Sequence, residues 1–241
     1  MWYFYIIIGL LVFFAFTVRV ITGFGSAMIL TPVLSLFLGP KNAVIISILM
    51  ESVMAVVFIV KEKLNFEIRQ IFSGGIVGII VGIILFGLLP TRILGLIIGI
   101  SVLTFSVIFL LNINFRTKRE GLLFTVLGLI SGSMGVLTGI NGPPIVFGLV
   151  NQQYDATFIR RCLITYLIVI DIITLASFSI SGYVTVDLVL LLIYSIPFIL
   201  IAYVVGKYIL TFTDPEKLKR IILFTTLFVG IIAIWKFLPW W

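Results

Sequence analysis

Apolar residues follow one another along this chain in long runs, separated by short polar or Gly/Pro-rich stretches. A helix that crosses a bilayer needs about 20 mostly apolar residues. Runs such as 76–89 and 188–203 are apolar on every face and lack the alternation of membrane β-strands, so they predict helices. The candidate segments cover residues 2–21, 26–38, 42–60, 68–89, 93–112, 121–137, 142–150, 156–180, 186–206 and 218–238.

Two of these segments, 26–38 and 142–150, are too short to cross a bilayer comfortably. Each follows a Gly-rich interruption, which we call the first break (residues 22–26) and the second break (residues 138–144). We expect each short segment to return the chain to the side from which it entered. It does so either as a re-entrant loop or as one of a tight pair of short crossings.

The two breaks resemble copies of each other, and acidic residues follow them in the same order. The matching pairs are Thr22-Gly23 with Thr138-Gly139, Glu51 with Asp171, and Glu67 with Asp187. The sequence therefore predicts an internal repeat with a first half over 1–115 and a second half over 119–241, joined by the basic linker 116–118. In each half we expect a Gly-broken helical hairpin followed by three transmembrane helices.

Composition excludes a soluble domain, because 62% of the residues are hydrophobic and only 10% are charged. The hairpin arrangement places most basic residues on one side of the membrane. These are Lys61, Lys63, Arg69, Arg116, Lys118, Arg119, Arg160, Arg161, Lys207, Lys217, Lys219 and Arg220, whereas Lys41, Arg92 and Lys236 fall on the other side. The positive-inside rule makes the first side cytoplasmic and places both termini outside the cytoplasm.

An odd number of segments in each half gives the halves opposite orientations. Such inverted repeats are the recurrent architecture of secondary transporters, whose substrate site lies near the midplane between the repeats. The alternative is a duplication that only supplies two packing units. We therefore expect an all-α polytopic protein of the cytoplasmic membrane, built of two inverted repeats.

The rest of the composition narrows the chemistry. The net charge of +7 does not indicate nucleic-acid binding, because the basic residues lie in short connections between apolar runs. The chain has one cysteine and no histidine, which excludes an intramolecular disulfide framework and removes the commonest general base and metal ligand. We expect no metal and no cofactor.

The breaks are the candidate binding site. Non-helical backbone inside a membrane is tolerated only when it is buried in protein or lines a water-filled cavity. Asn141 is a good helix N-cap and Ser26 is expected to serve likewise in the first half. The free N–H groups and dipoles of two restarting helices attract an anion. The expected substrate-binding residues are Gly23, Phe24, Gly25, Ser26, Gly139, Asn141, Gly142, Pro143, Pro144 and Arg19. For Gly74, Gly75, Gly78, Gly82, Gly95 and Gly99 we favour close helix packing instead.

Two acids are placed near the middle of the membrane. Glu51 and Asp171 each follow a basic residue by about 15 Å of helix, and an ionisable residue at that depth marks an ion or proton pathway. The alternative is that each acid hydrogen-bonds a broken helix. Arg19 precedes the first break; it binds the anion, pairs with an acid, faces a water-filled vestibule or snorkels to the interface. Glu67 and Asp187 suit the starts of helices and are interpreted as structural.

The chain resembles the sulfite exporter TauE/SafE family of membrane permeases. The resemblance rests on residues 23–32 (GFGSAMILTP), 128–135 (GLISGSMG) and 139–144 (GINGPP). Ser26-Ala27 stand where the family often has further glycines, and Pro143-Pro144 replace a glycine-rich continuation. The resemblance implies transport of small anions, typically sulfur-containing ones such as sulfite or organosulfonates, across the cytoplasmic membrane.

The leading hypothesis is a secondary transporter, an exporter, for a small sulfur-containing anion, with protons as a second ligand and lipid as its surroundings. Glu51 and Asp171 carry protons or shape the pathway, and one half rocks against the other. A passive anion channel and an intramembrane enzyme acting on a lipid through these two acids are the alternatives. The enzyme is disfavoured, because the sequence offers no metal-ligand cluster and no Ser/Cys–base pair.

Overall fold

The computed structural model describes the backbone of residues 2–111, 113, 115–212 and 215–238, and side chains within 5–212 and 226–238. These residues form ten helices and no strand. The helices are α1 (Trp2–Thr22), α2 (Ser26–Leu38), α3 (Pro40–Lys61), α4 (Arg69–Leu88), α5 (Thr91–Leu110), α6 (Glu120–Thr138), α7 (Gly142–Asn151), α8 (Ala156–Ile180), α9 (Val186–Leu210) and α10 (Pro215–Phe237). Each predicted segment is thus confirmed as a helix.

Seven helices in the described part of the chain are long and apolar enough to cross a membrane: α1, α3, α4, α5, α6, α8 and α9. The helices α2 and α7 have only 13 and 10 residues, as their sequences predict. The protein is therefore a multi-pass, all-helical membrane protein.

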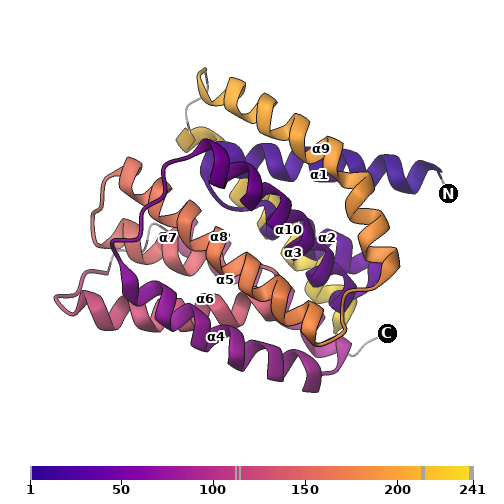
Figure 1. The fold of residues 1–241 in the computed structure, drawn as a ribbon, viewed down its shortest axis with the longest axis horizontal. Coiled ribbons are helices and arrows are strands. Elements are labelled where there is room, and N and C mark those ends of the chain that lie inside the picture. Colours follow the sequence, from indigo (N-terminus) through magenta and orange to yellow (C-terminus); the bar gives the residue numbers. More distant parts are fainter. Residues whose placement is uncertain (1, 112, 114, 213–214, 239–241) are drawn as a thin grey trace.

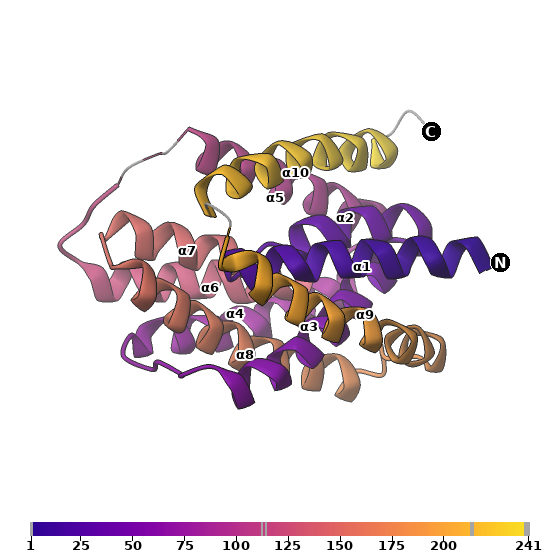
Figure 2. The same ribbon diagram turned by 90° about the horizontal axis from the view of Figure 1, so that it is seen from above.

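The helices pack into two bundles and a separate pair (Figure 1). We call α1, α2, α3 and α9 the first bundle, and α4, α6, α7 and α8 the second bundle. The bundles meet mainly where α3 packs on α8, and α5 pairs with α10 along one face of the molecule (Figure 2). Each bundle contains one long helix from the other half of the sequence, because α9 joins the first bundle and α4 the second.

Glycines bring α4 and α6 into backbone contact. A Cβ atom on Gly78 would lie 2.3 Å from the carbonyl oxygen of Leu129, and one on Gly132 would lie 2.1 Å from that of Gly75. Real Cβ atoms do not approach a carbonyl so closely, so a side chain here would push the helices apart. The packing role that the sequence predicted for Gly74, Gly75, Gly78 and Gly82 is confirmed. It is also confirmed for Gly95 and Gly99, which lie against α10.

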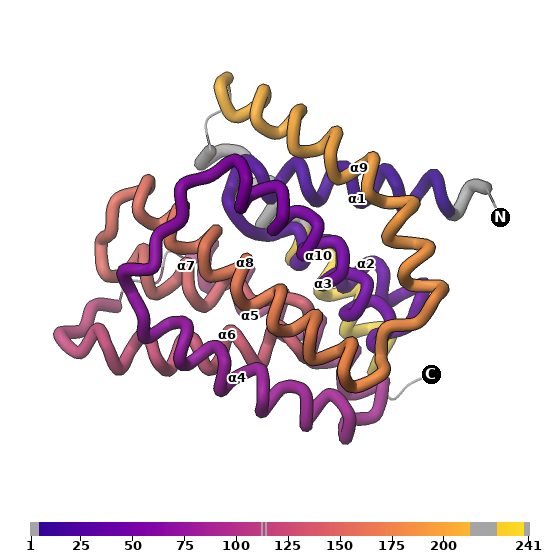
Figure 3. Tube along the Cα trace, in the orientation of Figure 1, coloured from indigo at the N-terminus to yellow at the C-terminus, as the bar shows by residue number. Residues whose placement is uncertain are grey.

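The part of α1 that follows Tyr5 and the end of α10 lie at the same end of the molecule (Figure 3). The linker between α5 and α6 lies at the opposite end, where it holds the α7–α8 connection: Arg116 Nη1 donates to Gln153 Oε1 at 3.0 Å. Nearby, the hydroxyl of Tyr154 donates to Glu120 Oε2 at 3.1 Å. Partial burial and this hydrogen bond raise the pKa of Tyr154. The linker thus fixes the C-terminal end of α7, whose N-terminal end forms part of the second break.

We predict that Gly132→Ala destabilises the protein by about 1–3 kcal/mol or more, because its methyl group meets the backbone of α4. Gly121→Ala on the same helix is the matched control, since a Cβ there approaches nothing closer than 3.8 Å. Thermal unfolding of the purified protein in detergent measures both. Equal melting temperatures for the two variants would contradict the packing described here.

Candidate functional site

The first break owes its shape to two glycines. The last turn of α1 closes with the amide of Gly23 donating to the carbonyl of Arg19 at 2.7 Å. Gly23 and Gly25 then adopt φ angles of +85° and +101°, in the left-handed region that residues with a Cβ rarely occupy. The chain therefore turns within three residues from the end of α1 into the start of α2, deep inside the protein.

The helix starts at the breaks are not capped by side chains. The expectation that Ser26 caps α2 is wrong: Gly25 holds the cap position, and the hydroxyl of Ser26 donates to Glu51 Oε1 instead. Asn141 does hold the cap position of α7, but its side chain makes no capping hydrogen bond and its Nδ2 donates to Asp171 Oδ1 at 2.6 Å. Both polar side chains have turned to an intramembrane acid because the acids are buried beside them.

The two helix starts differ in the donors they offer. The first N–H groups of an α-helix have no partner within the helix. Ser26, Ala27 and Met28 all carry an N–H in the first turn of α2. In the first turn of α7, Pro143 and Pro144 carry none. The first break consequently offers more N–H donors than the second.

Arg19 lies between the two acids at the centre of the protein. Its Nη1 is ion-paired with Glu51 Oε2, and its Nη2 lies 3.5 Å from Asp171 Oδ2. Arg19 and Glu51 are each 2% exposed and Asp171 is fully buried. Among the alternatives for Arg19, the structure shows pairing with acids, and the snorkelling alternative is wrong. If all three groups are ionised, the cluster carries one negative charge in excess.

Several hydrogen-bonding positions of this cluster are unused. Arg19 Nε and Thr174 Oγ1 are buried and have no hydrogen-bond partner among the described residues. The guanidinium of Arg19 lies over the ring of Phe58, 5.8 Å from its centroid. A buried guanidinium donor without an acceptor is costly, so an acceptor at this position would stabilise the cluster.

Two further hydrogen bonds lie beside the breaks. The hydroxyl of Ser131 donates to the carbonyl oxygen of Asn141, and Thr31 Oγ1 donates to Ser47 Oγ at 3.0 Å. Ser131 belongs to the Gly-rich motif of α6, but sequence reasoning gave it no role, since nothing in the sequence indicates that α6 folds back onto its own break. For the Thr31–Ser47 hydrogen bond, the sequence offers one indication: Ser47 lies one helical turn from Glu51.

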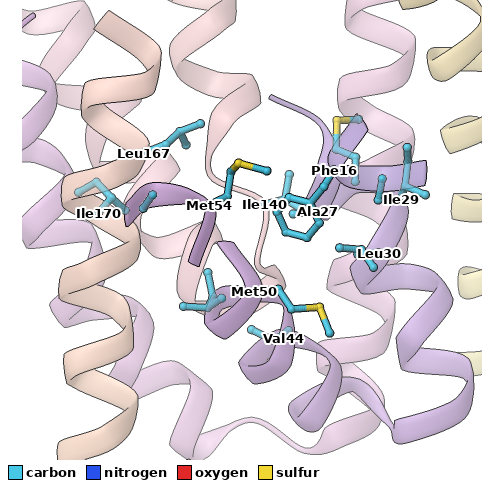
Figure 4. Packing of buried hydrophobic residues seen from close by; sticks show 14 of the residues in the cluster. Phe16, Ala27, Ile29, Leu30, Val44, Met50, Met54, Ile140, Leu167 and Ile170 are labelled. Carbon is cyan, nitrogen blue, oxygen red and sulfur yellow. The ribbon is translucent and has the colours of Figure 1, made fainter. Parts of the chain in front are cut away.

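A cavity of about 10 Å³ lies between the breaks, with room for about one water molecule. Its lining residues are Arg19, Phe24, Gly25, Ser26, Ala27, Met28, Glu51, Ile140, Asn141, Gly142, Pro143 and Leu167. Most of the predicted binding residues therefore meet around one space. Apolar core side chains surround it, and Figure 4 shows Ile140 of the second break among buried residues of α2, α3 and α8.

Some predicted residues lie outside this lining. Gly139 adopts a φ angle of +73° and packs against α2, where a Cβ would lie 2.8 Å from Thr31 Oγ1. Gly23 lies near Leu163, and Pro144 is buried in the first turn of α7. Asp171 reaches the site only through Arg19 and Asn141. These residues support the site rather than face its cavity.

A larger cavity of about 320 Å³, which we call the vestibule, lies next to the first. It is lined by Ile21, Thr22, Phe24, Val146, Ala156, Ile159, Arg160, Leu163 and Leu210. Phe24 lines both cavities and separates them; its ring packs on Phe109 with centroids 5.7 Å apart. The vestibule lies between the two bundles, at the end where α1 and α9 stop and α8 starts.

Ionic contacts cross between the bundles beside the vestibule. Arg160 of α8 donates to the carbonyl oxygen of Val20 at 3.1 Å and lies 3.8 Å from Glu62. Glu62 is also 3.0 Å from the ammonium group of Lys207. Sequence reasoning interpreted Arg160 chiefly as a topology marker. The structure adds that it fastens the second bundle to the end of α1.

Comparison with known proteins gives one match. The family model described as Sulfite exporter TauE/SafE matches residues 8–233, which include both breaks, Arg19, Glu51 and Asp171. Comparisons with curated proteins and with solved structures gave no significant match.

We predict that Arg19→Met destabilises the protein by about 3–5 kcal/mol, because two carboxylates then remain buried without a cation. Adding Glu51→Gln to Arg19→Met restores part of the loss, since it removes one of the uncompensated charges. Thermal unfolding of both variants in detergent measures the difference. A double variant that is less stable than Arg19→Met would show that the ion cluster is not what holds these helices.

Proposed function

The chain belongs to the sulfite exporter TauE/SafE family of membrane permeases, and we propose on this premise that it is a secondary transporter exporting a small sulfur-containing anion. Sulfite and organosulfonates are the proposed substrates. The observation that carries the proposal is a buried arginine beside an uncapped helix start in the middle of a membrane protein.

The first break supplies what a small oxyanion needs. Arg19 contributes a fixed positive charge and an unpartnered Nε, and the first turn of α2 contributes free N–H groups and the positive end of its dipole. In the low dielectric of a membrane protein these donors act more strongly on an anion than they would in water. Discontinuous helices whose N-termini face the substrate are the recurrent device of midplane transport sites.

Protons are the proposed coupling ion. The cluster of Arg19, Glu51 and Asp171 has one carboxylate more than it has cations, and isolated charges are costly at this depth. A proton on either acid neutralises the excess negative charge of the cluster, and a bound anion then restores one negative charge. Substrate and proton are therefore favoured together, so the two would cross the membrane in the same direction, and export would follow an outward gradient of the anion or of protons.

Alternating access is proposed to move the two bundles rather than the two halves of the sequence. The backbone contacts of α4 with α6 join different halves and leave no room for sliding. The bundles, by contrast, meet mainly through α3 and α8, on which Glu51 and Asp171 lie. The inverted repeat is supported by matching pairings, since α1 packs on α9 as α6 packs on α4.

The proposed orientation follows the basic residues. The vestibule lies at the end of the molecule that carries Arg160 and Lys207, and the positive-inside rule makes this end cytoplasmic. An anion leaving the cytoplasm would enter the vestibule and reach the site past Phe24. A passive channel is a poorer fit, because the site is closed to little more than one water molecule and its charges are paired.

We expect purified protein in proteoliposomes to move sulfite, and a proton gradient to drive its accumulation. Glu51→Gln is expected to abolish the proton-driven part and Asp171→Asn to weaken it, because each removes an acid of the cluster. Asp187→Asn is the matched control, since it removes a carboxylate at the start of α9, away from the cluster. No movement of sulfite or organosulfonates under any gradient would overturn transport. Unchanged proton-driven accumulation in both acid variants would overturn the coupling alone.

Thiol labelling tests the vestibule and the orientation. In a Cys162→Ala background, Thr22→Cys is expected to react with a membrane-impermeant thiol reagent from the side bearing the basic residues, and not from the other side. Ser47→Cys, fully buried beyond the site, is the control and is expected to react from neither side. Labelling of Thr22→Cys only from the side of the termini would reverse the proposed orientation.

A further inference from the structure

We infer that the carboxylate of Glu51 occupies the position of the transported anion, as a tethered competitor that must leave Arg19 before the substrate binds. The inference rests on the proposed function and assigns Glu51 a role in it. Glu51 and the substrate would then alternate at Arg19, and protonation of Glu51 would favour the substrate.

Glu51 contacts two donor side chains at the first break, those of Arg19 and Ser26. One oxygen, Oε2, is ion-paired with Arg19 Nη1, and the other, Oε1, accepts the hydroxyl hydrogen of Ser26 at the start of α2. A carboxylate offers the same kind of acceptor as a sulfite or sulfonate group, namely negatively charged oxygens on one centre. Its place between a guanidinium and a helix N-terminus is that of a bound oxyanion.

Asp171 does not occupy an equivalent position, although it matches Glu51 in the repeat. Its Oδ2 lies 3.5 Å from Arg19, and its Oδ1 accepts from the amide of Asn141. The helix start beside it, α7, begins with Gly142-Pro143-Pro144 and offers fewer N–H groups. Asp171 therefore orients Arg19 from the side, whereas Glu51 is held by both Arg19 and the hydroxyl of Ser26 at the start of α2.

The volume of the site requires an exchange rather than an addition. The cavity beside Glu51 measures about 10 Å³, about the space of one water molecule. A sulfite or sulfonate group is several times larger than a water molecule. With the bundles in this arrangement it fits only if the Glu51 side chain moves away, and the anion then takes the place of Glu51 at Arg19.

The charges around Glu51 set the sign of the pH dependence. The charged groups that face it are Arg19 from α1 and Asp171 from α8. The other helices packed on α3 contribute none: α2 has no charged residue, and the charged side chains of α5, α6 and α9 lie near helix ends. A proton on Glu51 removes the competitor and leaves Arg19 available, so anion binding strengthens as the pH falls and weakens as it rises.

Equilibrium binding to purified protein in detergent tests the exchange directly. The probes are methanesulfonate, whose charge does not change between mildly acidic and mildly basic pH, and sulfite. For the wild type we expect tighter methanesulfonate binding at acidic pH. Glu51→Gln removes a charge-assisted competitor and is expected to bind at least about tenfold tighter at neutral pH, with little remaining pH dependence.

Asp171→Asn is the matched control, because it removes the same charge from beside Arg19 but leaves Glu51 bound to Arg19 and Ser26. It is expected to keep the pH dependence. Glu51→Asp retains the charge on a shorter side chain and serves where Glu51→Gln fails to fold; it is expected to bind more tightly than the wild type. Equal tightening in Glu51→Gln and Asp171→Asn, or weaker binding in Glu51→Gln, would overturn the inference while leaving anion transport intact. No binding of either probe to any variant, together with no flux in proteoliposomes, would overturn the proposed function as well.

Discussion

One guanidinium between two carboxylates, out of reach of water, is the interaction on which the arrangement of this protein depends. Burying any one of these charges alone would cost several kcal/mol, so Arg19 of α1, Glu51 of α3 and Asp171 of α8 must come together. This requirement fixes the last turn of α1 relative to the middle parts of α3 and α8. The apolar side chains around them determine how closely the helices approach, whereas the ion cluster determines their register along one another.

Glycines impose the second constraint. Where α4 meets α6, the backbones themselves are in contact, and α7 and α8 pack on this pair. A membrane offers little hydrophobic drive for helix association, so close packing and polar contacts must supply it. In this protein the close glycine packing and the polar contacts lie in different places. Glycine packing is densest at the periphery, between α4 and α6, whereas the polar contacts lie where the bundles meet.

Much of this could be predicted from the sequence. Hydropathy located every helix, and the repeated breaks and the depth of Glu51 and Asp171 pointed to the region where the structure has its buried ion cluster and a small cavity. The sequence could not show which side chains form hydrogen bonds or ion pairs with one another. Asn141 and Ser26 are ordinary capping residues by type, and only the fold shows that each turns to an acid roughly 25–30 positions away in sequence. Several roles were open for Arg19, because its partners Glu51 and Asp171 lie on other helices, and no local sequence pattern shows that α3 and α8 pack beside the end of α1. The vestibule is lined by four separate segments, and no sequence pattern in any one of them indicates a cavity.

The exchange of α4 and α9 between the bundles has a consequence for biosynthesis. When the ribosome has delivered α1 to α5, the membrane holds an arginine and a glutamate whose third partner, Asp171, has not been made. At that stage α1 lacks α9, α4 lacks α6 and α5 lacks α10. The first half therefore cannot complete its packing until the last helices insert. A chain that stalls midway would expose the glycine-lined surfaces of α4 and α5 to the lipid.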